Sequence, residues 1–259
     1  MTAKNDLFDV SGKVALVTGG TRGIGFMIAK GLVQAGVKTY VVSRKADACA
    51  AAEEELKQYG DAVGIAADLG DQQQLSKLAD ELLRREPKLH ILVNNAGASW
   101  GANFAEFPES GWDKVMDLNL KSIFFLTQKL GSALQAAGTD EDPARVINIG
   151  SVDGLTSPAY GNYSYSASKA AVHHLTRHLA AHLASANINV NAIAPGPFET
   201  KMTEQMLKAK GDEIIKVIPR RRTGLESDAA GTAIFLSSAA SSYITGAVIP
   251  LDGGFSTTR

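Results

Sequence analysis

The sequence predicts an α/β fold in which helices cover both faces of a parallel sheet. Short apolar segments rich in β-branched residues alternate with longer helical patterns along the chain. These segments are continuously apolar, as in KVALVT (13–18), which is typical of strands covered on both faces. Repeated strand–helix–strand units with right-handed crossovers then form a doubly wound sheet. Since no linker or change in composition interrupts the pattern, we expect residues 1–259 to form a single domain.

The first half of the chain has clear start and stop signals. One helical pattern closes at Gly36, and another begins after Asp71, a favourable N-cap, and ends before Pro87. The predicted strands of this half are 13–18, 38–43, 62–68 and 89–95, and the predicted helices are 22–36, 46–59 and 71–86.

The second half continues the alternation with one interruption, between Phe198 and Gly224. Ligands of doubly wound sheets bind beyond the carboxyl ends of the strands, and this segment directly follows such an end. We therefore predict a substrate lid over 198–224, although its apolar positions also suit an amphipathic helix that covers the core. The predicted strands are 144–150, 188–194 and 246–250, the helices are 112–137, 163–186 and 226–239, and TDEDPAR (139–145) is a predicted solvated turn.

Composition excludes several classes of protein. With 45% hydrophobic and 20% charged residues and a formal net charge of -1, nothing indicates nucleic-acid binding. Cys49 is the only cysteine, so no intrachain disulfide can form and a reducing compartment, the cytoplasm, is expected. The amino-terminal residues lack an apolar signal segment, and no later segment is apolar and long enough to cross a membrane. We therefore expect neither secretion nor membrane insertion.

A glycine-rich turn, TGGTRGIG (18–25), directly follows the first predicted strand and opens the first helix. Such a turn lets the backbone approach a pyrophosphate and directs a helix N-terminus at it. An ordinary strand-to-helix turn also explains one or two of the glycines, but the position at the start of a strand–helix series favours dinucleotide binding.

The end of the second strand indicates which dinucleotide is bound. An acidic residue there would accept hydrogen bonds from the ribose hydroxyls, whereas this chain has Ser43, Arg44 and Lys45. Arg22 of the glycine turn can reach the same place, and converging cations favour the 2′-phosphate of NADP over NAD. Solvated surface charges remain the alternative. Asp68, at the end of the third strand, suits either the adenine amino group or a helix cap.

The segment YGNYSYSASKA (160–170) contains three tyrosines and one lysine. A phenol with a pKa near ~10 is a poor acid or base at neutral pH, and a neighbouring cation is expected to lower that pKa. On a helix Lys169 shares a face with the residue four positions earlier, Tyr165. Tyr163 lies roughly 600° around the helix from Lys169, on the far side, and Tyr160 precedes the helix. The spacing therefore selects Tyr165 as the acid/base group.

Taken in order, the motifs of this chain resemble those of the classical short-chain dehydrogenases/reductases over nearly its whole length. Within that family it is most similar to the bacterial 3-oxoacyl reductases. The resemblance implies a Rossmann fold with seven parallel strands in the order 3-2-1-4-5-6-7, and a homotetramer. The matching motifs are TGGTRGIG, NNAG (94–97), Asn119 in MDLNLKS, Ser151 in NIGSV, YSASK (165–169) and NAIAPGPFETKM (191–202).

The resemblance also implies roles for individual residues. Ser151 polarises a substrate carbonyl, Lys169 binds the nicotinamide ribose, and Asn119 holds a water that relays protons to the lysine. Together with Tyr165 these are the expected catalytic residues. The expected NADP(H)-binding residues are Gly19, Thr21, Arg22, Gly23, Ile24, Gly25, Ser43, Arg44, Lys45, Asp68, Leu69, Asn95, Ala96, Gly97, Tyr165, Lys169, Pro195, Gly196 and Thr200.

Three functions are compatible with these motifs. The favoured one is NADPH-dependent reduction of a ketone, a 3-oxoacyl or similar carbonyl compound, to a secondary alcohol. The second is NADP-linked oxidation of a sugar, polyol or sterol alcohol. The third is a non-catalytic NADP(H)-binding regulator, which would not need the tyrosine.

Two further features concern partners and metals. Carrier-protein reductases of the family present basic residues at the ends of two long helices, but here those ends, LQAAGTDED and LASANIN, lack lysine and arginine. This difference argues against docking of an acyl carrier protein. His174, His178 and His182 have the spacing of zinc ligands, but no third-ligand carboxylate accompanies them. We expect surface or interface histidines and no metal site.

Overall fold

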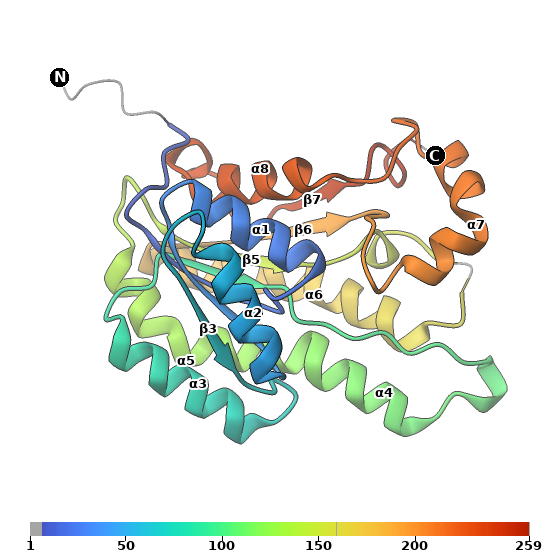
Figure 1. Cartoon of the computed structure of the whole chain (residues 1–259), viewed down its shortest axis with the longest axis horizontal. Helices are drawn as coiled ribbons and strands as arrows, with labels where there is room; N and C mark the ends of the chain where they lie inside the picture. The colour runs from blue at the N-terminus through green and yellow to red at the C-terminus, as the bar shows by residue number, and fades with distance from the viewer. Residues whose placement is uncertain (1–6, 159, 259) are drawn as a thin grey trace.

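A computed structural model describes residues 7–158 and 160–258. Its centre is a seven-stranded parallel sheet in the order β3-β2-β1-β4-β5-β6-β7, which confirms the predicted fold class and strand order (Figure 1). The register brings Leu16 of the interior strand β1 between Tyr40 of β2 and Leu92 of β4. The strands are β1 (Val14–Thr18), β2 (Lys38–Ser43), β3 (Ala62–Ala66), β4 (Ile91–Asn94), β5 (Ala144–Ile149), β6 (Ile188–Pro195) and β7 (Val248–Leu251).

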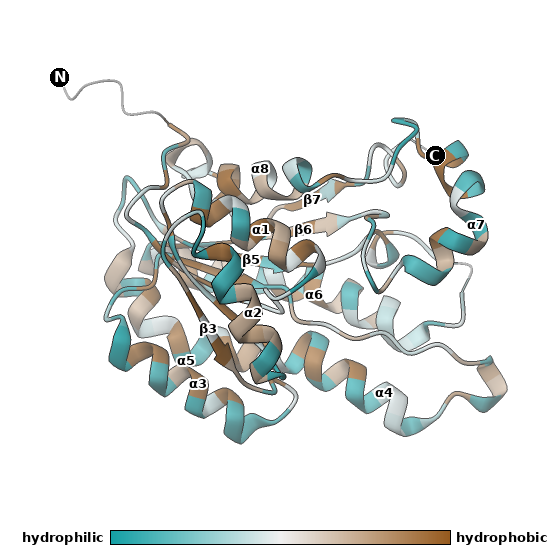
Figure 2. Cartoon of the chain, viewed as in Figure 1, coloured by the Kyte–Doolittle hydropathy of each residue, from teal (hydrophilic) through white to brown (hydrophobic). Residues whose placement is uncertain are grey.

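Helices cover the sheet on both sides, and the hydrophobic residues concentrate between them and the strands (Figure 2). Neighbouring residues of a strand point to opposite faces, so Val17 packs with α1, α2 and α8 while Leu16 packs with α3, α5 and α6. The helices are α1 (Gly23–Gln34), α2 (Ala46–Leu56), α3 (Gln72–Arg85), α4 (Glu109–Met116), α5 (Ser122–Ala137), α6 (Tyr163–Leu183), α7 (Glu204–Val217) and α8 (Glu226–Ser237), with short helices η1 (Phe104–Glu106), η2 (Asp117–Lys121), η3 (Val152–Gly154), η4 (Ala184–Ala186) and η5 (Ala239–Ser241).

The helix predicted over 112–137 differs most from the structure. Helix α4 begins earlier, at Glu109, and is joined to α5 by a π-helical turn, η2 (Asp117–Lys121). A π-helical turn contains one residue more than an α-helical turn, so it changes the direction in which its side chains point. The π-turn carries the buried residue Asn119.

The predicted lid segment 198–224 is closed at its base and contains α7. Phe198 and Gly224 form a parallel bridge, and Gly224 N donates to Pro197 O at 2.9 Å. A Cβ atom on Gly224 would lie 2.2 Å from the Phe198 ring, so glycine is required at this position. No residue of α7 is buried, and Lys210 interrupts its helical backbone. The alternative prediction, an amphipathic helix covering the core, is therefore wrong.

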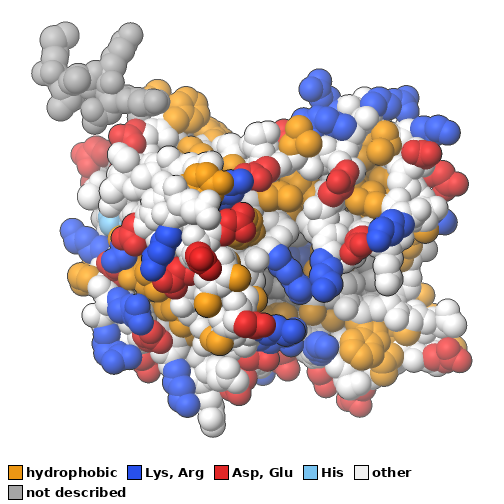
Figure 3. All heavy atoms as spheres, viewed as in Figure 1, with side chains coloured by type: hydrophobic (Ala, Val, Ile, Leu, Met, Phe, Trp, Pro, Cys, Tyr) orange, Lys and Arg blue, Asp and Glu red, His pale blue; other side chains and the backbone are white. Residues whose placement is uncertain are grey.

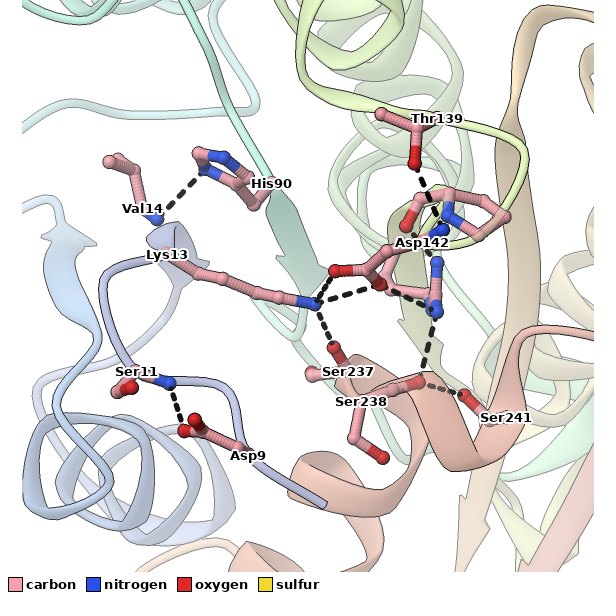
Figure 4. A network of polar contacts seen from close by, with 12 residues as sticks. Asp9, Ser11, Lys13, Val14, His90, Thr139, Asp142, Ser237, Ser238 and Ser241 are labelled. Atoms are coloured by element: carbon pink, nitrogen blue, oxygen red, sulfur yellow. Dashed lines mark hydrogen bonds and ion pairs between the residues drawn. The ribbon is translucent and has the colours of Figure 1, made fainter. Parts of the chain in front are cut away.

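The acidic turn before β5 is not merely solvated (Figure 4). Lys13 Nζ donates to Asp142 Oδ1 at 3.0 Å and to Ser237 O at 2.9 Å. The buried Arg145 donates to the same carboxylate oxygen at 3.1 Å and to Ser238 O at 2.9 Å. This network joins the amino ends of β1 and β5 to the end of α8. It therefore lies at the amino ends of the strands, whereas the predicted site lies at their carboxyl ends.

Within the part of the chain that the structure describes, no helix is both long and apolar enough to span a membrane.

Candidate active site

Tyr165 and Lys169 lie one turn apart on α6, as their spacing predicts. Lys169 Nζ lies 5.6 Å from the centroid of the Tyr165 ring and donates to Ile149 O, at the end of β5, at 2.7 Å. The lysine is only 4% exposed. Tyr163 instead stacks edge-to-face on Phe104 and Phe107, with both centroid distances 5.8 Å. The structure therefore brings Tyr165, and not Tyr163, to the lysine.

Ser151 follows β5 and completes this cluster. Burial is the largest effect on the Tyr165 hydroxyl and raises its pKa to about 12, whereas the Ser151 hydroxyl acts in the opposite direction. The expectation of a lowered pKa is therefore wrong for this structure. Burial also lowers the pKa of Lys169 to about 8, because a dry environment disfavours the ammonium. The phenol is consequently held in its protonated form at neutral pH.

Asn119 connects the π-turn η2 to two other elements. Its Oδ1 accepts from Ala98 N at 2.8 Å, and its Nδ2 donates to Ala98 O at 2.9 Å and to Ser168 Oγ at 3.0 Å. Both amide hydrogens are therefore engaged, and the side chain holds the segment after β4 against α6. The role of water carrier remains a prediction. We refer to Asn119, Ser151, Tyr165 and Lys169 as the site floor.

His173 is a buried residue of this region that the sequence analysis did not select. Its ring is 3% exposed, and its Nε2 accepts from Ser151 N at 3.5 Å. Cβ atoms on Gly150 and Gly154 would lie 2.1 Å and 2.8 Å from ring atoms of His173, so both glycines are needed for the ring to fit under Ser151. Burial lowers the pKa of His173 to about 4, which keeps the ring neutral.

The glycine turn is supported from beneath by Asn95, at the end of β4. Asn95 Nδ2 donates to Thr18 O at 2.9 Å and to Gly19 O at 3.2 Å. A Cβ atom on Gly25 would lie 2.2 Å from that nitrogen, so a larger residue would displace the support. The Asn95 side chain thus stabilises the turn. Backbone N–H groups of Asn95 and Ala96 donate to Thr18 Oγ1 at 2.9 Å and 3.0 Å.

Three cations predicted to meet the cofactor, Arg22, Arg44 and Lys45, are exposed. Within residues 7–158 and 160–258, no acidic side chain pairs with any of them. Figure 3 shows Lys and Arg side chains beside the hollow between α2 and α7. Ser43 Oγ contacts Cys49 Sγ at 3.3 Å, and Asp68 Oδ1 accepts from Gly70 N at 3.0 Å in a local turn.

The remaining predicted cofactor residues also lie near the carboxyl ends of the strands. A Cβ atom on Gly23 would lie 3.3 Å from Thr200 Cγ2, so the start of the lid segment faces the glycine turn. Pro195 ends β6, and Gly196 packs against Asp252. Thr21 and Ile24 are half-buried in the turn, Leu69 is buried after β3, and Gly97 faces Asn119. The open glycine turn and the unpaired cations fit a nicotinamide dinucleotide.

The lid segment borders a cavity of about 580 Å³. Residues from α7 and both ends of the segment line it, among them Thr200, Leu207, Ile215 and Thr223.

On α6, His178 Nε2 and His182 Nε2 lie 3.0 Å apart. Among the described residues, no group of three or more His, Cys, Asp or Glu side chains could hold a metal ion.

This architecture and site define an oxidoreductase that acts on CH–OH groups with a nicotinamide cofactor. The chain belongs to the short-chain dehydrogenase family, because residues 13–211 match that family, described as "short chain dehydrogenase". The family assignment made from the motifs is thereby confirmed.

Curated relatives cover almost the whole chain. It is 46% identical over 252 residues to the rhamnolipids biosynthesis 3-oxoacyl-[acyl-carrier-protein] reductase of Pseudomonas aeruginosa, covering 96% of this chain and 98% of the relative. It is 40% identical to the 2-dehydro-3-deoxy-D-gluconate 5-dehydrogenase of Dickeya dadantii, covering 96% and 97%. Among solved structures, the RhlG/NADP active-site complex of Pseudomonas aeruginosa matches with a TM-score of 0.94 at 45% identity, covering 97% of this chain and 99% of that one. The protein is thus similar to 3-oxoacyl reductases, and sugar-acid dehydrogenases are also close relatives.

Proposed function

We propose that this protein reduces a ketone, a 3-oxoacyl or similar carbonyl compound, to a secondary alcohol with NADPH. The observation that carries this proposal is the position of Tyr165 one helical turn from the buried Lys169, whose ammonium lies 5.6 Å from the centroid of the tyrosine ring. The 3-oxoacyl reductase of Pseudomonas aeruginosa, at 46% identity, supports the substrate class.

In this proposal the cofactor, when bound, supplies a hydride to the carbonyl carbon. Ser151 donates a hydrogen bond to the carbonyl oxygen and so polarises it, and Tyr165 gives its proton to the oxygen as negative charge develops there. Because the pKa of Tyr165 lies well above neutral, the phenol is protonated before each turnover. The Lys169 ammonium then stabilises the phenolate that remains, until a proton from solvent restores it.

The preference for NADPH rests on Arg22, Arg44 and Lys45, which are exposed and have no acidic partner among the described residues. A guanidinium suits a phosphate because it offers several donors in one plane. The structure of the relative in complex with NADP supports the same preference.

Initial rates with NADPH and NADH test both parts of the proposal. We expect 3-oxo esters and thioesters to be reduced with NADPH, and Arg44→Ser to raise the KM for NADPH about tenfold or more, since a hydrogen bond to a charged group contributes about 1.5–3 kcal/mol. The KM for NADH should change little. Arg84→Ser, on the remote helix α3, is the matched control. Equal effects of Arg44→Ser on both cofactors would contradict the assignment of NADPH.

A second candidate function is NADP-linked oxidation of a sugar or polyol, favoured by the 40% identical 2-dehydro-3-deoxy-D-gluconate 5-dehydrogenase. The same assay separates the two, because a sugar dehydrogenase would be inert towards acyl thioesters. A homotetramer is part of the proposal on the strength of the family resemblance alone.

A further inference from the structure

Asp153 lies beside the site floor, and no role was predicted for it. It belongs to η3, the short helix that follows Ser151, and its backbone N–H donates to Ser151 Oγ at 3.1 Å. A Cβ atom on Gly154 would lie 2.7 Å from the backbone of both Lys169 and Ala170. Helix η3 is therefore packed directly on α6, which fixes the backbone of Asp153 relative to Ser151 and Lys169.

The carboxylate has a neutral partner. Asn162 Nδ2, just before α6 begins, donates to Asp153 Oδ2 at 2.9 Å. In residues 7–158 and 160–258, no cation forms an ion pair with Asp153, and its Oδ1 receives no hydrogen bond. The nearby ammonium of Lys169 is directed at Ile149 O instead. The negative charge of Asp153 is therefore only partly compensated.

The negative charge of Asp153 acts on both Tyr165 and Lys169. It raises the pKa of Tyr165 and also opposes the lowering of the Lys169 pKa. Charges interact more strongly in a half-buried site than in bulk water, because the effective dielectric constant is lower. A substrate that brings a second negative charge close to Tyr165 would therefore be repelled by the Asp153 carboxylate.

We propose that Asp153 determines specificity by excluding substrates that carry a carboxylate close to the reacting carbonyl, as free 3-oxo acids do. The site then selects neutral ketones, such as 3-oxo esters and thioesters, over free 3-oxo acids. This inference rests on the proposed function, since it concerns the substrate of the same Tyr165. Discrimination between two substrates can be achieved by a repulsive element that acts on one of them, and Asp153 supplies such an element.

Two substrates that differ only in the charge test this inference: ethyl acetoacetate and acetoacetate. The kcat and KM for each are measured with NADPH in the parent protein, in Asp153→Asn and in Asp153→Ser. The parent should prefer the ester. Both variants should reduce that preference about tenfold or more, mainly by lowering the KM for acetoacetate, because the repulsion is lost. Asp80→Asn, an exposed aspartate on α3, removes the same charge at a distance and should leave the preference unchanged.

The outcomes separate the inference from the function on which it rests. If the parent reduces the ester but the preference survives in a folded Asp153 variant, as judged by circular dichroism, the inference is wrong and the proposed function stands. An equal loss of preference in Asp80→Asn would also overturn it, because the effect would then be one of overall charge. If the parent reduces neither compound nor any other ketone, the proposed function and the inference fall together.

Discussion

The site floor and the lid segment 198–224 differ sharply in how the fold holds them. In the floor, Asn119, Ser151 and Lys169 are buried, and each makes a hydrogen bond to another element. In the lid segment no residue of α7 is buried, Lys210 breaks the helix, and Met202 is 57% exposed. Outside α7 the segment is better packed, at its base between Phe198 and Gly224 and at the buried Ile218.

This difference in packing indicates that the site floor and the lid segment have different roles. Groups that must be held in a fixed geometry lie on buried secondary structure, whereas a loosely packed segment can adapt to different substrates. We therefore expect changes in the floor to affect all substrates equally. Changes in the lid segment should be smaller and should depend on the substrate.

Tyr165→Phe tests the floor with the largest expected effect. The substitution removes the proton donor but keeps the ring, and general acid catalysis contributes about 10²–10⁴-fold to rate. We expect kcat to fall about a thousandfold for every ketone tested, with a circular dichroism spectrum like that of the parent. Tyr163→Phe keeps the stack on Phe104 and is the control. Full turnover by Tyr165→Phe would refute the assigned proton donor.

The buried His173 gives a second, intermediate prediction about the floor. Its pKa is about 4 in the folded protein and near ~6.5 in the unfolded chain, so the unfolded chain binds the proton more tightly. The stability contribution of the neutral ring is therefore complete above about pH 6.5 and is lost as the pH falls towards 4. Between pH 7 and pH 5 this linkage amounts to about 2 kcal/mol of unfolding free energy.

Urea denaturation at pH 7 and pH 5 measures this effect. We expect the loss of stability between the two values to be about 2 kcal/mol smaller in His173→Gln than in the parent, because glutamine does not titrate. His178→Gln, at an exposed position of the same helix, should behave as the parent does. An unchanged pH dependence in His173→Gln would show that the ring is not held neutral beneath Ser151.

The same two regions show what the sequence could predict. Local periodicity located each strand and most helices within about three residues, and spacing alone selected Tyr165 and Lys169. The π-turn at Asn119 was not predictable in this way, because it depends on contacts with Ala98 and Ser168 far along the chain. The Tyr165 pKa was predicted in the wrong direction, since burial is a tertiary property.

His173 could have been found. It lies four residues after Lys169 and eight after Tyr165, so it shares their face of the helix. Glycines at 150 and 154, on either side of Ser151, were a further signal that a bulky ring needed space there. The histidine stripe at 174, 178 and 182 lies on a different, exposed face.

Leu207→Ala in α7 tests the lid segment with the smallest expected effect. Leu207 lines the cavity under α7 and is half-buried, so its truncation should cost less than about 1 kcal/mol of stability, well below the 2–5 kcal/mol typical of a buried leucine. We expect the KM for long-chain 3-oxoacyl substrates to rise a few fold, because a half-buried side chain contributes only part of its transfer free energy to a bound chain. The KM for ethyl acetoacetate, which has no long acyl chain, should not change. Met202→Ala removes a more exposed side chain outside the cavity and is the matched control. A fall in kcat that is equal for short and long substrates would mean that α7 supports the floor, and the division between the two regions would then be wrong.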